Sequence, residues 1–201
     1  MRSEYDPFLA PARRRFESSN LEAARDLFSA ASRPYLLSPL PWAAWAVILP
    51  GAALATPAIG REFDWVGILF LWSAAILVGG AFELVAIRRG AAGDEIVSTP
   101  LASWAFGVQA NLSLVTIGLS FFLLWVDSAW ALPGLWLLLL GHSFVTLGGL
   151  AFPPLRQAGL IYQIGGVAAL WPHGAPLVVL AVTAFAANVW MMIAVRQKPA
   201  D

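Results

Sequence analysis

Polar side chains that could do chemistry are few in this sequence, and most of them fall inside long apolar segments. One segment carries four polar residues spaced four, three and four apart, which places them on one face of a helix: Gln109, Ser113, Thr116 and Ser120. With the polar groups of the segments that follow, the candidates for a ligand site or a pore are Gln109, Asn111, Ser113, His142, Thr146, Gln163 and Asn188. Most of them lie within about two helical turns of one depth. They predict either the floor of a small-molecule site or hydrogen bonds that hold helices together.

Two ionisable residues extend this set of candidates. The neutral imidazole of His142 could relay protons or hold a metal or haem. No second histidine and no carboxylate accompanies it at ligand spacing, which favours a buried, hydrogen-bonded structural histidine and no metal site. Glu83 is the acidic residue well inside an apolar segment, where a carboxylate can carry protons or bind a cation. Pairing with Arg88 or Arg89, about one turn away, would satisfy it without any such function.

Several chemistries have no residues to support them. The chain has no cysteine, which excludes disulfides, thiolate metal sites and a cysteine nucleophile. It also has no phosphate-binding glycine loop, no HExxH pattern and no serine elbow, and its single lysine, Lys198, stands near the C-terminus. The formal net charge of zero gives no case for nucleic acid as a partner. We therefore expect no cofactor and no enzymatic activity.

The elements that must position these residues are long apolar runs. Of the 201 residues, 59% are hydrophobic and 12% are charged, against about 25% charged residues in soluble domains. Runs of roughly 20 apolar residues match the thickness of a bilayer. The sequence predicts an all-α polytopic bundle of six transmembrane helices, near Leu40–Ile59, Trp65–Ile87, Leu101–Val126, Ala129–Phe152, Leu155–Trp171 and Ala175–Val195. Pro50 lies inside the first of these helices and is expected to kink it.

The placement of basic residues predicts an orientation. Six crossings put eleven of the twelve basic residues on one side: Arg2, Arg13, Arg14, Arg15, Arg25, Arg33, Arg88, Arg89, Arg156, Arg196 and Lys198. Arg61 falls alone on the other side. The positive-inside rule then places both termini in the cytoplasm. Seven of the ten tryptophans lie near the expected membrane boundaries, where indole rings anchor helices: Trp42, Trp45, Trp65, Trp104, Trp125, Trp130 and Trp171.

The chain divides into a cytoplasmic arm over residues 1–36, a transmembrane domain over 37–196 and a cytoplasmic tail over 197–201. Within the arm, Ser19 and Glu22 have the spacing of a capping box, which predicts a short amphipathic helix at the membrane surface or against the bundle. Alternatively, this helix docks a partner.

Paired glycines predict where membrane helices approach each other closely. The pairs are Gly79 with Gly80 and Gly148 with Gly149, and each pair is followed closely by alanine and phenylalanine. Because both pairs lie towards the cytoplasmic ends of helices that run in the same direction, a repeated helical hairpin would produce this pattern.

The run from Leu132 to Gly141, with its Pro-Gly-Leu-Trp opening, and the run from Gly148 to Pro154 resemble a group of small, uncharacterised bacterial membrane proteins. Those proteins are similar in layout, with a charged cytoplasmic start and about six apolar helices. The resemblance implies a bacterial inner-membrane location and no activity. We expect a structural, accessory or regulatory component of a membrane assembly, in contact with the lipid bilayer and with other membrane subunits or further copies of itself. The alternatives are a small transporter or channel and, third, an intramembrane enzyme that would need Glu83 and His142 in one cavity.

Overall fold

The computed structural model describes residues 23, 38–90, 100–150, 152–171 and 174–197. Over these ranges the chain forms five α-helices, one short 3-10 helix and no strand, so the all-α prediction is confirmed there. The elements are α2 (Pro39–Gly90), α3 (Pro100–Trp125), η1 (Ala129–Ala131), α4 (Leu132–Leu150), α5 (Pro153–Ala169) and α6 (Pro176–Arg196). The capping box of the N-terminal arm and the tail beyond Gln197 lie outside the described residues.

Three helical stretches of the described chain are long and apolar enough to cross a membrane: Pro39–Ala86, Ala129–Gly148 and Pro176–Arg196. A shorter apolar stretch covers Ala110–Trp125. Each apolar run is helical because a helix satisfies all of its backbone hydrogen bonds internally, which is what a segment surrounded by hydrocarbon requires.

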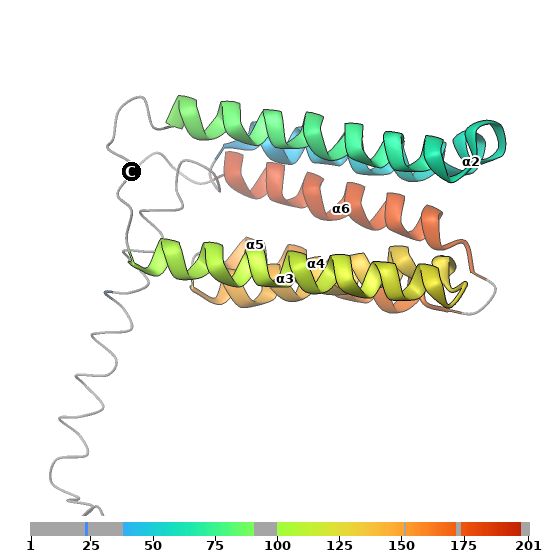
Figure 1. Ribbon diagram of the computed structural model, residues 1–201. Helices are drawn as coiled ribbons and strands as arrows, with labels where there is room; N and C mark the ends of the chain where they lie inside the picture. Colours follow the sequence, from blue (N-terminus) through green and yellow to red (C-terminus); the bar gives the residue numbers. More distant parts are fainter. Residues whose placement is uncertain (1–22, 24–37, 91–99, 151, 172–173, 198–201) are drawn as a thin grey trace, which may run out of the picture.

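The first two predicted segments are the two helical arms of α2, which meet at Asp64, where the chain reverses direction (Figure 1). Asp64 has φ 55° and ψ −158°, a backbone conformation that is essentially restricted to glycine. Three facing pairs lie at equal distances of four, eight and nineteen residues from Asp64: Gly60 with Ile68, Thr56 with Trp72, and Trp45 with Glu83. The two arms of α2 are therefore antiparallel and in register along most of their length.

The backbone at Pro50 and Pro57 stays helical, and Asp64 is the residue at which α2 departs from helical dihedral angles. The kink expected at Pro50 stays a prediction, and the reversal at Asp64 lies in the break predicted between Ile59 and Trp65.

The end of α3 is a Schellman motif, in which two backbone N–H groups close over the last helical turn. Ser128 donates to the Leu123 carbonyl at 2.8 Å, and Asp127 donates to the Leu124 carbonyl at 3.3 Å. Asp127 takes the left-handed position with φ 53°, where glycine is the usual residue. Both hairpin turns, at Asp64 and Asp127, are thus made by an aspartate with positive φ.

Helices α4 and α5 pack against each other through glycines at seven-residue intervals. Gly134, Gly141 and Gly148 lie on α4, and Gly159 and Gly166 lie on α5. A Cβ added to Gly141 would lie 2.7 Å from the Gly159 carbonyl oxygen, and one added to Gly159 would lie 2.8 Å from that of Gly141. Gly134 and Gly166 stand in the same reciprocal relation at 3.0 Å. The two backbones therefore meet directly at Gly141 and Gly159, whereas the Leu170 and Leu138 side chains pack against Gly134 and Gly166.

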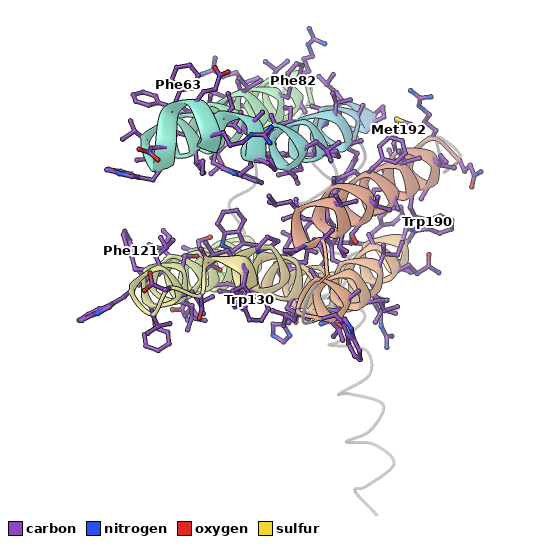
Figure 2. The ribbon with its side chains drawn as sticks, turned by 90° about the vertical axis from the view of Figure 1, so that its right-hand side faces the viewer. Phe63, Phe82, Phe121, Trp130, Trp190 and Met192 are labelled. Carbon is purple, nitrogen blue, oxygen red and sulfur yellow. The ribbon has the colours of Figure 1, made fainter. Side chains whose placement is uncertain are left out.

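Helix α6 lies between α2 on one side and the group formed by α3, α4 and α5 on the other (Figure 1). Its buried positions are mainly small, with Ala181, Ala184 and Ala187 facing inward and Met191 fully buried among them. By contrast, large apolar side chains such as Phe63, Phe121 and Trp190 are exposed at the outside of the bundle (Figure 2). This distribution, with small residues inside and large apolar ones outside, is typical of helices packed in a bilayer.

Candidate functional site

The most deeply buried polar contact among the described residues joins α5 to α6. The Nδ2 group of Asn188 donates to the Tyr162 hydroxyl at 2.7 Å and to the Ala184 carbonyl of its own helix at 2.8 Å. Asn188 and Tyr162 are 2% and 1% exposed. Asn188 therefore acts in helix packing here, which is one of the two roles that the sequence left open.

An edge-to-face series of aromatic rings leads outward from this pair. The Tyr162 ring lies 5.6 Å from that of Phe144 on α4, and Phe144 lies 5.9 Å from Trp42 on α2. Trp42 is buried in the core at 3% exposure, so its expected role as an interfacial anchor is wrong. The reason is that Trp42 is part of the buried core cluster, where its ring meets Phe144 of α4 and α2 as a whole packs against α6.

A second aromatic contact joins α2 to α4, near the position where α4 also meets α3. The indole rings of Trp72 and Trp136 meet edge-to-face with centroids 5.1 Å apart. Each indole N–H is donated to a hydroxyl sixteen residues earlier in the chain, Trp72 to Thr56 at 3.1 Å and Trp136 to Ser120 at 2.9 Å. Ser120 belongs to the polar face of α3, and at this residue, near the end of the helix, that face meets Trp136 of α4.

Glu83 is held by a tryptophan on the facing arm of α2. The Trp45 Nε1 group donates to Glu83 Oε1 at 2.8 Å. Gly79 lies one turn before Glu83 and its missing side chain leaves the space that the Trp45 ring occupies. The carboxylate, half-buried in this position, therefore receives a hydrogen bond from an indole that is seated against the same helix.

The remaining candidates do not gather around Asn188. Asn111 and Ser113 are exposed on α3, and His142 and Thr146 are exposed on α4. The prediction of a buried His142 is thus wrong, because the glycine face of α4 turns to α5 and its aromatic face turns to the core. Gln163 is half-buried on α5, next to Gly141. Gln109 lies within α3, and its side chain is outside the described part of the structure.

Two of the four predicted packing glycines make close contacts. Gly79 faces the Trp45 ring, and Gly148 faces the backbone of Arg156. Gly80 has open space around it, and Gly149 lies in α4 without a described environment. The sequence interpretation missed Gly134, Gly141, Gly159 and Gly166, although their seven-residue spacing is visible in the sequence and is the signal that would have identified them.

The interior offers no spare polar atom within the described ranges. Every buried side-chain nitrogen or oxygen there has a hydrogen-bond partner. No three histidine, aspartate or glutamate side chains of those ranges lie close enough together to hold a metal ion.

Charges and tryptophans are distributed differently at the two ends of the bundle. Arg88 and Arg89 are in the last turn of α2, Arg156 is near the start of α5 and Arg196 is in the last turn of α6, all at the end opposite to the hairpin turns (Figure 1). At the end with the turns stand Arg61 and four exposed tryptophans: Trp65, Trp125, Trp130 and Trp171.

Comparison of the chain with protein-family models, with curated proteins and with solved structures finds no match.

Proposed function

We propose that the protein spans the bacterial inner membrane six times with both termini in the cytoplasm, as a structural, accessory or regulatory component of a larger membrane assembly. The two antiparallel arms of α2, together with α3 to α6, supply the six segments. The four described arginines at one end support the orientation, and the four exposed tryptophans at the other end support a membrane boundary there.

One observation supports the functional part of the proposal. Several polar residues in the middle of helices lie on the outer surface of the bundle and not in its core. The described core is filled with alanine, glycine and bonded polar atoms, whereas mid-helix polar residues such as Asn111 and His142 face outward. Polar groups in contact with hydrocarbon are unfavourable, so an outward-facing histidine or asparagine indicates a surface that another protein covers. A transport site in the mid-membrane polar layer stays the alternative prediction.

The size of the native particle tests the assembly. The protein should be extracted from its own host in a mild detergent at natural abundance and sized without prior purification. We expect a particle well above the mass of one chain with its detergent. A single chain at every expression level would rule out the assembly role.

The orientation has its own test, because the chain has no cysteine to remove. Glu62→Cys at the α2 turn should react with a membrane-impermeant maleimide added to intact cells. Gln197→Cys after α6 should react only after the cells are opened. The opposite result would reverse the proposed orientation.

A further inference from the structure

Almost every residue of α4 is buried or half-buried by the rest of the chain. The residues that are exposed are polar. Over residues 132–148 every position is buried or half-buried except two, His142 and Thr146. These two residues are one turn apart and share one face of the helix. The face toward α5 is made by Gly134 and Gly141, and the face toward the core by Leu137 and Phe144.

The two exposed residues lie near the middle of α4, where exposure of a polar group to hydrocarbon is most unfavourable. His142 is the eleventh of the nineteen residues of α4, so it stands at the middle of the helix. Leaving a polar group without a hydrogen bond in an apolar medium is strongly unfavourable. Thr146 reduces its own cost by donating its hydroxyl to the His142 carbonyl at 2.9 Å, which still leaves oxygen lone pairs to accept. The imidazole has a donor and an acceptor nitrogen to satisfy.

We propose that this face of α4 is a docking surface for a second copy of the same chain, with the two copies related by a two-fold axis along the membrane normal and passing near His142. This inference rests on the proposed membrane assembly and names the partner. Such an axis brings each residue to its own copy at the same depth. A neutral imidazole is self-complementary in that position, because one ring donates through N–H and the other accepts.

The surroundings of His142 fit a partner of the same kind. The outer face of the neighbouring α5 carries exposed apolar side chains, Leu160, Ile164 and Val167, and none of them is charged. Two such faces can meet with apolar flanks and one polar contact at the centre. A charged partner would find no charge to pair with in this stretch.

Cysteine cross-linking in native membranes tests the proposal directly, since the chain has no cysteine of its own. His142→Cys and Thr146→Cys should each give a covalent dimer of twice the chain mass on mild oxidation, with the higher yield at the position nearer the axis. Val182→Cys on α6 is the matched control, with a side chain that is 64% exposed on another helix. We expect at least a fivefold lower dimer yield there.

Each other result overturns the inference. Equal yields at all three positions would show random collision. A product of any other mass at residue 142 would show that a different protein covers α4. No product at residues 142 and 146, with the native particle still large, would remove this surface but leave the assembly role standing.

A second measurement does not depend on cysteine. His142→Leu should lower the dimer fraction of the purified protein several-fold, whereas His142→Gln, which keeps a donor and an acceptor, should restore most of it. Because the side chain is exposed, the melting temperature of the monomer should be the same for both variants. An unchanged dimer fraction in His142→Leu contradicts the proposed contact.

Discussion

The two arms of α2 and the α4–α5 pair are both antiparallel helix pairs, but their facing surfaces differ. The arms of α2 are joined through long side chains, with Trp45 bonded to Glu83 and Trp72 bonded to Thr56. Helices α4 and α5 meet backbone to backbone through glycines. The first arrangement can adjust by rotating a side chain, whereas the second cannot at Gly141, Gly148 and Gly159, because the nearest atoms there belong to the main chain. The same topology is thus built with different tolerance to substitution.

The burial of the two regions agrees with this difference. In the most apolar part of α2, 11% of residues are buried, against 39% in the most apolar part of Ala129–Gly148, which covers most of α4. The α2 hairpin therefore presents most of its surface outward, and a few side-chain bonds define its register.

The largest effect is expected at the glycine contact. Gly141→Leu should destabilise the protein by at least ~2 kcal/mol, because its side chain would meet the Gly159 carbonyl and the Gln163 backbone. Thermal unfolding in detergent measures it. Gly80→Leu is the control, since a Cβ there meets nothing within 4 Å and should leave the melting temperature near that of the natural protein. Equal losses in the two variants would break the comparison.

A smaller effect is expected at the bond between α5 and α6. Asn188→Leu should cost about 1.5 kcal/mol, because the buried Tyr162 hydroxyl loses its partner. Adding Tyr162→Phe should recover part of that loss, since both polar groups are then absent. Strict additivity of the two changes in the unfolding free energy would show that the bond contributes nothing.

Gly79→Ala tests the difference between the two helix pairs. It places a methyl group against the Trp45 side chain, whereas Gly141→Ala places one against the backbone of α5. The Trp45 ring must move, and its bond to Glu83 must lengthen or break. We expect a loss of about 1 kcal/mol, less than that of Gly141→Ala. Unfolding curves of both variants under identical conditions decide this, and the reverse order would show that the α2 arms are the more rigid pair.

The smallest effect is expected at Thr56→Val, which removes the acceptor of the Trp72 N–H while keeping the volume. Bonds of this kind between membrane helices average about 0.6 kcal/mol. Thr116→Val is the control, because that hydroxyl bonds the Leu112 carbonyl of its own helix. If Thr56→Val and Thr116→Val have equal unfolding free energies, the tryptophan bond does not hold the arms together.

The helices themselves could be predicted from the sequence, because a long apolar run surrounded by hydrocarbon satisfies its backbone hydrogen bonds by forming a helix. The ends of α3, Pro100 and Trp125, differ by one residue from the prediction. The direction in which each helix faces could not be predicted in the same way. Helix α4 is apolar on nearly every side, so its periodicity does not distinguish the face toward α5 from the one that carries His142. That choice is made by the glycine contacts with α5, which are long-range.

The break between Ile59 and Trp65 was predicted, but the residue that makes the reversal, Asp64, was not identified, for a local reason. Neither glycine nor proline occupies the turning residue, and the positive φ is taken by an aspartate instead. The Trp42 error has a long-range cause, because the contact with Phe144 of α4, about one hundred residues further along the chain, is what separates a core indole from a boundary one.

The equal spacing of contacts about Asp64 determines where the chain can tolerate a change in length. A residue inserted next to Asp64 lengthens the turn and leaves both arms with the same faces toward each other. The same insertion between Trp72 and Glu83 would turn the rest of that arm by about 100° about its axis and carry Glu83 away from Trp45. Length variants of this protein should therefore survive at the turn and fail within the arms.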